Sequence, residues 1–197
     1  MNYLKAITDI LERQGGIVTT AQVSAAGIPR LYLSKMTAKK LLQRVDRGIY
    51  ATPEAWVDEM FLLQYKYSKG IFSHETALYI HGFTDRTPTR FLMTFPYGYH
   101  TESISGTNIR MKKVVKSIYE LGIVERATPF GNTIRLYDLE RTLCDIVKGN
   151  NSCDIQIVNQ AMKRYALSKE KNISRLLEYA ELLRVKPKIL AYMEILL

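Results

Sequence analysis

The sequence has few of the residues that build disulfide-linked or metal-dependent proteins. Its 197 residues include two cysteines, three histidines and one tryptophan. Cys144 and Cys153 are too few for a disulfide framework, and Cys144 lies in a helical pattern that favours a buried free thiol. His74, His81 and His100 stand apart from the cysteines, so the spacing forms no metal-ligand quartet. We therefore expect neither a bound metal nor a disulfide.

Long apolar runs and cofactor motifs are also missing. No apolar run approaches the ~18–20 residues that a membrane helix needs. The first residues lack the charged-then-apolar pattern of a secretion signal. The sequence has neither a phosphate-binding loop nor a paired-glycine dinucleotide motif. These absences favour a cytoplasmic protein that binds no cofactor and is not an enzyme.

Positive charge is what the chain has in excess. Its 28 Lys and Arg residues outnumber its 19 Asp and Glu residues, which gives a formal net charge of +9. Such a balance favours a polyanionic partner, although a solubilising surface would show the same sign. The excess is uneven, because Gly27–Arg47 holds six basic residues and a single acid, Asp46.

The first 55 residues follow the element order of a winged helix-turn-helix. Apolar residues recur at helical spacing over Tyr3–Gln14, and the following glycines end that helix. The remaining elements are a β-like run at Ile17–Val18, a short helix over Ala21–Ala26 capped by Thr20, a third helix with Pro29 in its first turn, and a hairpin over Gln43–Ala51. Three helices and a hairpin are a known device for reading DNA.

The third helix and its neighbours supply the candidate DNA contacts. Tyr32, Leu33 and Met36 share a face that we expect to pack inward, which turns the basic side chains outward. A solvated helix face is the alternative reading of that pattern. We expect Arg30, Ser34 and Lys35 to enter the major groove and Thr19, Thr20 and Gln22 to contact phosphates. The other predicted DNA-binding residues are Lys39, which follows Lys35 in the chain, and Arg44 and Arg47 in the wing.

The remainder of the chain predicts an α+β protein, with a mixed α/β domain over 56–197 after the N-terminal domain over 1–55. Strand-like runs cover Arg90–Phe95, Ile109–Met111, Ile118–Tyr119, Ile123–Glu125 and Thr133–Tyr137. Helical patterns cover roughly Pro53–Ser68, Ser73–Gly82, Leu139–Lys148, Asp154–Tyr165, Ile173–Leu183 and Pro187–Leu197, so the C-terminal part is helical.

Two further groups of residues carry open alternatives. The basic cluster Arg110, Lys112, Lys113 and Lys116 is either a second nucleic-acid patch or an exposed strand edge protected by lysines. Asp138 and Glu140 lie at a helix start, where carboxylates match the helix dipole. In an enzyme the same pair would bind a divalent cation or transfer a proton. Arg141 and Asp145 are spaced to pair along that helix.

Several motifs in order resemble the AbiEi-type antitoxins of abortive-infection, type IV toxin–antitoxin systems. The N-terminal motifs are Gly15–Thr20, Gly27–Arg30 and Arg44–Ala51, and those of the second domain are Phe72–Leu78 and Tyr137–Asp145. The resemblance implies an autorepressor that binds inverted repeats in double-stranded DNA upstream of its operon. It also implies a second domain that counters a nucleotidyltransferase-like toxin without a stable complex, as part of phage defence.

Two other functions are compatible with the sequence. One is an ordinary winged-helix transcription regulator whose second domain senses a ligand or self-associates, which rests on fold analogy alone. The other is a nuclease or kinase-like catalyst built around Asp138 and Glu140. The toxin's own pattern, a Gly-Ser followed by spaced aspartates, is absent from the sequence, which favours the antitoxin over the toxin.

Overall fold

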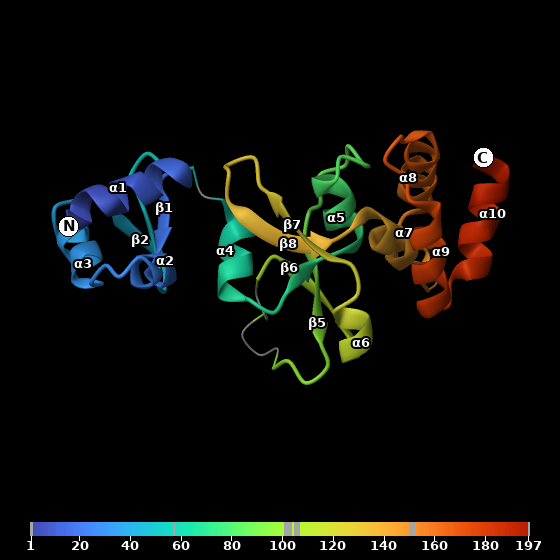
Figure 1. Ribbon diagram of the computed structural model, residues 1–197, viewed down its shortest axis with the longest axis horizontal. Helices are drawn as coiled ribbons and strands as arrows, with labels where there is room; N and C mark the ends of the chain where they lie inside the picture. Colours follow the sequence, from blue (N-terminus) through green and yellow to red (C-terminus); the bar gives the residue numbers. More distant parts are fainter. Residues whose placement is uncertain (1, 57, 101–103, 105–106, 150–152, 197) are drawn as a thin grey trace. The chain divides into compact units, whose positions relative to one another are not determined.

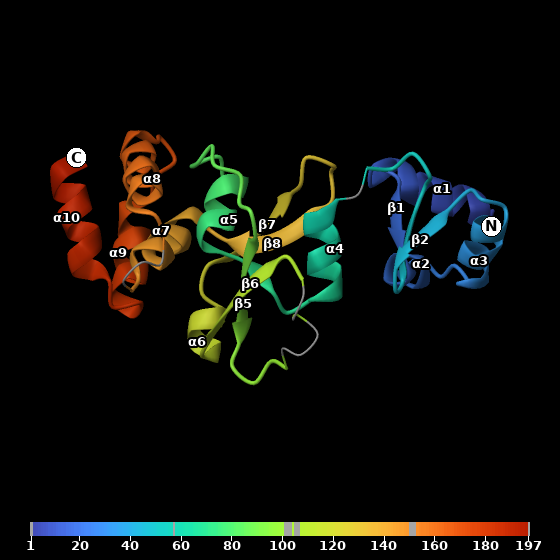
Figure 2. The same ribbon diagram turned by 180° about the vertical axis from the view of Figure 1, so that it is seen from behind.

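The computed structural model describes residues 2–56, 58–100, 104, 107–149 and 153–196. The chain forms two compact units: Met1–Lys66 with Ala127–Ile134, and Tyr67–Arg126 with Arg135–Leu197. Helices and two sheets alternate along it, so the mixed α/β composition is confirmed (Figures 1 and 2). The first compact unit extends past residue 55, and the functional boundary between residues 55 and 56 stays a prediction.

The first unit combines four helices with a three-stranded sheet. In chain order its elements are α1 (Tyr3–Arg13), β1 (Ile17–Thr19), α2 (Thr20–Ala25), α3 (Leu31–Ala38), β2 (Gln43–Asp46), β3 (Ile49–Ala51) and α4 (Glu59–Lys66). The strand order is β1-β3-β2 and both pairings are antiparallel. The central strand β3 pairs Ile49 with Thr19 on one side and with Asp46 on the other.

Helices α1, α2 and α3 enclose a small apolar core. Ile7, Leu11, Val23, Leu33 and Met36 are all buried in it. The predicted inward face of α3 is therefore confirmed at Leu33 and Met36. The third predicted inward residue, Tyr32, packs against the same core but is only half-buried, and its ring contacts the ring of Tyr3 with 5.0 Å between the centroids.

The second sheet has the strand order β6-β5-β4-β8-β7. Its strands are β4 (Ile71–Phe72), β5 (Phe91–Pro96), β6 (Ile109–Val114), β7 (Ile123–Ala127) and β8 (Thr133–Tyr137). Strand β4 is antiparallel to β5 and parallel to β8, and β6 runs parallel to β5 at one edge. Buried apolar side chains fill β5, which places this strand inside the second unit.

The helices of the second unit share one large apolar core. They are α5 (His74–Ile80), α6 (Lys116–Tyr119), α7 (Leu139–Val147), α8 (Ile155–Leu167), α9 (Ile173–Leu182) and α10 (Lys186–Leu196). Helix α7 is buried along nearly its whole length and contributes Leu143, Cys144 and Ile146 to the core. The predicted buried free thiol at Cys144 is confirmed. In the part of the chain that is described, no helix is long and apolar enough to cross a membrane.

Some predicted elements differ from the structure at their ends or in kind. Residues Ile118–Tyr119, predicted as a strand, belong to helix α6, whose turn presents the carbonyl of Ile118 to the guanidinium of Arg141 at 2.6 Å. Thr19 caps α2, one residue before the predicted cap. Strand β4 was not predicted, because two residues are too short to show an alternating pattern.

Candidate nucleic-acid interface

Helix α3 presents a polar face that its buried residues hold outward. Leu33 and Met36 anchor the helix in the core of the first unit. Arg30, immediately before the helix, is exposed together with Ser34 and Lys35. Residues three and four positions apart lie on the same side of a helix. The face is not purely polar, because Leu31 is 59% exposed on it.

Local contacts orient the two cations of this face. The Nε of Arg30 donates a hydrogen bond to the hydroxyl of Ser24 at 3.0 Å. The ammonium of Lys35 lies over the ring of Tyr32, 5.2 Å from its centroid, which is cation–π geometry. These contacts limit the conformations of both side chains while leaving them exposed. No sequence pattern pointed to Ser24, because its partner Arg30 lies six positions further along the chain.

The hairpin between β2 and β3 places two exposed arginines near a turn. Arg44 lies on β2, and its Nε donates to the backbone carbonyl of Asp46 at 3.4 Å. The backbone N–H of Arg47 donates to the carboxylate of Asp46 at 2.6 Å. This bond, with added contributions from Lys66 and Arg44, holds the pKa of Asp46 below its ordinary value. Asp46 therefore stays ionised and organises the turn, while the side chains of Arg44 and Arg47 reach solvent.

The side chains predicted to contact phosphates at the start of α2 form hydrogen bonds within the protein. Thr19 is 1% exposed and forms a reciprocal capping box with Gln22. The amide nitrogen of Gln22 also donates to Gln14 at 2.5 Å. Thr20 is half-buried, with its hydroxyl 3.4 Å from the hydroxyl of Tyr65. The hydroxyl of Thr19 is thus engaged within the protein, and the phosphate contacts of Thr19, Thr20 and Gln22 stay a prediction.

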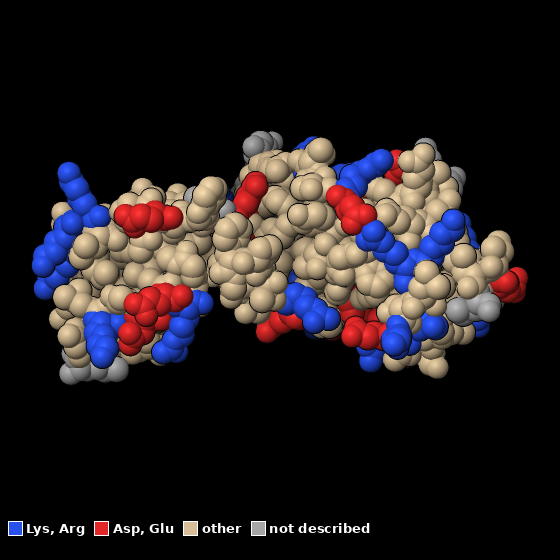
Figure 3. All heavy atoms as spheres, turned by 90° about the horizontal axis from the view of Figure 1, so that it is seen from above, with Lys and Arg blue, Asp and Glu red and all other residues tan. Residues whose placement is uncertain are grey.

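The remaining predicted basic residues lie on different elements of the two units. Lys39 is exposed at the C-terminal end of α3, in the same unit as the hairpin, and Figure 3 shows basic side chains on the surface of that unit. Of the predicted second patch, Lys112 and Lys113 line a cavity of the second unit, whereas Lys116 lies on α6 and pairs with Glu120 at 3.8 Å. Arg110 is exposed on the edge strand β6.

The carboxylates at the start of α7 are hydrogen-bonded inside the second unit. Asp138 caps the helix by accepting from the backbone of Arg141 at 2.8 Å, and it accepts from the hydroxyl of Tyr179 at 3.1 Å. Glu140 accepts from the hydroxyl of Tyr165 at 3.0 Å. Burial raises the pKa of Asp138, although the bond from Arg141 opposes that shift. These contacts give both carboxylates a role in packing the helices.

The histidines do not form a shared metal site. The Nε2 of His81 lies 2.9 Å from the carbonyl oxygen of Tyr137, and the ring of His74 lies beside Ser73. No group of three or more His, Cys, Asp or Glu side chains suited to a metal occurs among the residues that the structure describes. Ser73, predicted to cap α5, makes no capping bond and instead accepts from the hydroxyl of Thr94 at 2.9 Å.

Comparisons with known proteins relate the N-terminal part of the chain to a family of transcriptional regulators. Residues 5–53 match the family described as "Transcriptional regulator, AbiEi antitoxin". A search of curated proteins finds no match. Among solved structures, the chain is similar to the RV2827C protein from Mycobacterium tuberculosis, with 12% identity and a TM-score of 0.47 over 98% of this chain and 81% of that one. This structural likeness carries no conclusion about function. The resemblance to AbiEi-type antitoxins is thus confirmed for the N-terminal part of the chain, whose residues 5–53 match that family of transcriptional regulators.

Proposed function

We propose that the N-terminal part of the chain is a winged helix-turn-helix that binds inverted repeats upstream of its own operon and represses it. The observation that carries this proposal is the exposed face of α3, with Arg30, Ser34 and Lys35 held outward by buried Leu33 and Met36. A helix of this kind is the element that enters the major groove in helix-turn-helix proteins. The family match of residues 5–53 to transcriptional regulators supports the same function.

The proposed contacts divide into base reading and backbone positioning. Arg30 suits bidentate recognition of guanine, because its guanidinium is a planar fork of donors. Lys35 and Lys39 are point charges suited to phosphates, and the hairpin arginines Arg44 and Arg47 would reach phosphates or a minor groove. Ser34 lies between these charges on α3 and can donate to either kind of acceptor.

The second part of the chain is proposed to counter a nucleotidyltransferase-like toxin encoded beside it. This assignment follows from the AbiEi resemblance, and the regulator family of residues 5–53 favours a non-enzymatic role. The contacts that Asp138 and Glu140 make with tyrosines support packing roles over catalysis. The proposed antitoxin therefore acts in the cytoplasm without a cofactor and without a lasting complex with the toxin.

DNA binding is tested by fluorescence anisotropy with the full chain, its upstream duplex and a scrambled duplex, at two salt concentrations. Arg30→Ala is expected to weaken binding to the upstream duplex by about 1–3 kcal/mol and to reduce discrimination against the scrambled one. Lys35→Ala is expected to weaken both duplexes similarly and to lower the salt slope by about one unit.

A matched control comes from helix α1 of the same unit. Lys5 is exposed there and belongs to no proposed contact, so Lys5→Ala should leave affinity and salt slope nearly unchanged. Equal binding of the wild-type chain to both duplexes would contradict the operator proposal. Equal losses in Arg30→Ala and Lys5→Ala would show that net charge, and not the face of α3, determines binding.

Toxin neutralisation is tested by growth of cells that express the neighbouring toxin gene from a separate promoter. Co-expression of the wild-type chain is expected to restore growth. The double variant Arg30→Ala/Lys35→Ala should restore it equally, because the altered side chains are exposed on the first unit and serve DNA binding alone in this proposal. Absence of rescue by the wild-type chain would favour the ordinary regulator with a sensing or self-association domain.

A further inference from the structure

A cavity of about 330 Å³ in the second unit gathers basic side chains from three separate parts of the chain. Lys112 and Lys113 reach it from β6, Arg141 from α7, Lys148 from the end of α7, and His74 from the start of α5. The volume lies in the range of pockets that bind small molecules. We call these five residues, with the space that they line, the lysine pocket.

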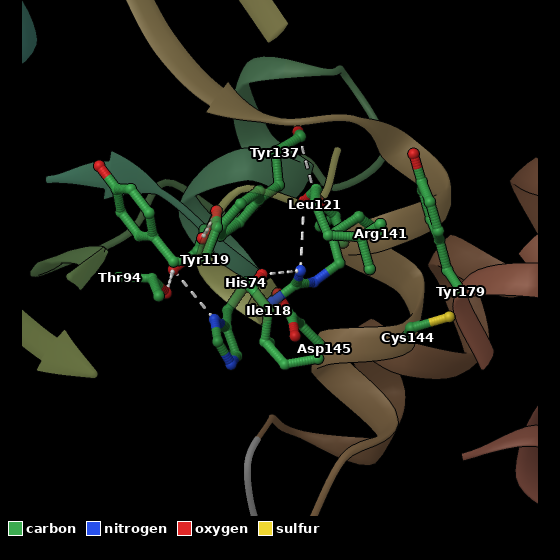
Figure 4. Close-up of polar contacts among 12 residues, drawn as sticks. His74, Thr94, Ile118, Tyr119, Leu121, Tyr137, Arg141, Cys144, Asp145 and Tyr179 are labelled. Atoms are coloured by element: carbon green, nitrogen blue, oxygen red, sulfur yellow. Dashed lines mark hydrogen bonds and ion pairs between the residues drawn. The ribbon is translucent and has the colours of Figure 1, made fainter. Parts of the chain in front are cut away.

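Buried side chains form the floor of the lysine pocket, and exposed lysines form its rim. Arg141 is 1% exposed and His74 4% exposed, and both lie on the floor with Asp145. Figure 4 shows His74, Arg141 and Asp145 close together, with Thr94 nearby. At the rim, Lys113 and Lys148 are exposed, whereas Lys112 is half-buried. A ligand would therefore meet lysines first and buried donors below them.

The net charge of the lysine pocket is positive. Arg141 and Asp145 neutralise each other in an ion pair of 3.1 Å. Within the described part of the chain, no carboxylate lies within ion-pair distance of Lys112, Lys113 or Lys148. Burial lowers the pKa of Lys112, and the nearby Arg110 and Lys148 lower it further against the opposing effect of Asp145. An anion in the pocket would offset this repulsion between cations.

His74 adds a neutral hydrogen-bond donor to the floor. Burial lowers its pKa to about 4, so the ring is uncharged at neutral pH. The Nδ1 of His74 lies 3.0 Å from the hydroxyl of Ser73, which accepts from the hydroxyl of Thr94 and retains a hydrogen of its own that it can donate to the ring. In the tautomer that accepts this hydrogen at Nδ1, the proton lies on Nε2, and Figure 4 shows this nitrogen on the side of the ring away from Thr94. Nε2 can therefore donate to a ligand oxygen.

The backbone at His74 supports a binding role. His74 has a φ of 52°, a left-handed conformation that is uncommon outside glycine. Such local strain persists where the surrounding structure determines it, and it clusters at ligand sites. Here the bonds among Thr94, Ser73 and His74 fix the ring at the pocket floor.

We propose that the lysine pocket binds the phosphate group of a small phosphorylated molecule. Three lysine ammonium groups without a paired carboxylate, together with a buried neutral donor, match the charge and the acceptor oxygens of a phosphate. The cavity volume leaves room for the organic part of such a ligand beside its phosphate. This site uses none of the residues proposed to bind the operator, so it stands independently of the proposed repressor function.

In the test, the full chain is titrated at constant ionic strength in sodium chloride. The three probes are inorganic phosphate, uridine 5′-monophosphate and a single-stranded oligonucleotide that lacks a terminal phosphate. Binding is measured by isothermal titration calorimetry, and thermal unfolding without ligand checks that each variant folds. We expect both phosphate probes to bind and the nucleotide to bind more tightly. Lys112→Gln and Lys148→Gln should each weaken binding by about tenfold or more.

Lys116→Gln is the matched control, because Lys116 belongs to the same basic cluster of the sequence but lies on α6 and does not line the cavity. This variant should bind both phosphate probes as the wild-type chain does. The absence of heat with both phosphate probes would overturn the proposal, as would equal losses in Lys116→Gln and Lys148→Gln. Tighter binding of the oligonucleotide than of the mononucleotide would overturn it too, by assigning the lysines to a nucleic-acid backbone.

Discussion

Arg141→Ala is expected to destabilise the second unit by about 3–5 kcal/mol. Arg141 is 1% exposed, and its Nε donates to the carboxylate of Asp145 at 3.1 Å. Its Nη1 donates to the carbonyls of Ile118 at 2.6 Å and Leu121 at 3.2 Å. Removal of the guanidinium leaves the buried charge of Asp145 and both carbonyls without these donors (Figure 4). Urea unfolding followed by helical circular dichroism measures the loss.

Arg164→Ala is the matched control for this prediction. Arg164 also pairs with an aspartate, Asp85, at 2.6 Å, but the side chains of this pair are 37% and 77% exposed. Exposed pairs contribute little to stability because water and salt screen them, so Arg164→Ala should lower the free energy of unfolding far less than Arg141→Ala. Similar losses in the two variants would mean that burial adds nothing to the Arg141–Asp145 pair.

The second large effect is expected for Leu143→Ala, at about 2–5 kcal/mol. Leu143 is 0% exposed on α7 and lies in the apolar core that unites the helices of the second unit. Truncation to alanine removes buried methyl groups and leaves a cavity where the neighbouring side chains cannot fully collapse. The measurement is again the urea midpoint, together with its slope, since an unchanged slope means that stability alone was altered.

Leu167→Ala serves as the control for Leu143→Ala, because it makes the same chemical change at a residue that is 85% exposed at the end of α8. Surface substitutions of this kind usually stay within about 0.5 kcal/mol. A loss at Leu143 no larger than at Leu167 would contradict the assignment of α7 as the centre of the core.

Local patterns in the sequence were sufficient for most of the elements. The run Thr133–Tyr137 forms strand β8 with the predicted bounds. Asp138 caps α7, and the four-residue spacing of Arg141 and Asp145 does produce an ion pair. Each of these features depends on residues within one turn or one strand, where spacing alone decides which side chains meet. The inward residues Leu33 and Met36 of α3 follow the same rule.

The sequence predicted the structure poorly where a residue's conformation depends on a partner far away in the chain. Ile118 and Tyr119 are residue types that favour strands, yet they belong to α6. The guanidinium of Arg141 donates to the carbonyl of Ile118 in this helix and to that of Leu121 just after it. The cap of α2 also differs from the prediction, because Thr19 takes that position. Its hydroxyl is buried in a capping box whose position the sequence placed one residue later.

The sequence by itself determined most of the elements, the inward face of α3 and the basic character of the chain, because those properties depend on neighbours in sequence. Only the tertiary structure decided that the Arg141–Asp145 pair is buried and that Lys112, Lys148 and His74 line one cavity. These residues are separated by tens of positions. Strand β5 pairs with β4, which precedes His74, and with β6, which carries Lys112, while Lys148 comes from the end of α7. Contacts over such distances depend on strand order and helix packing, which composition and periodicity do not encode.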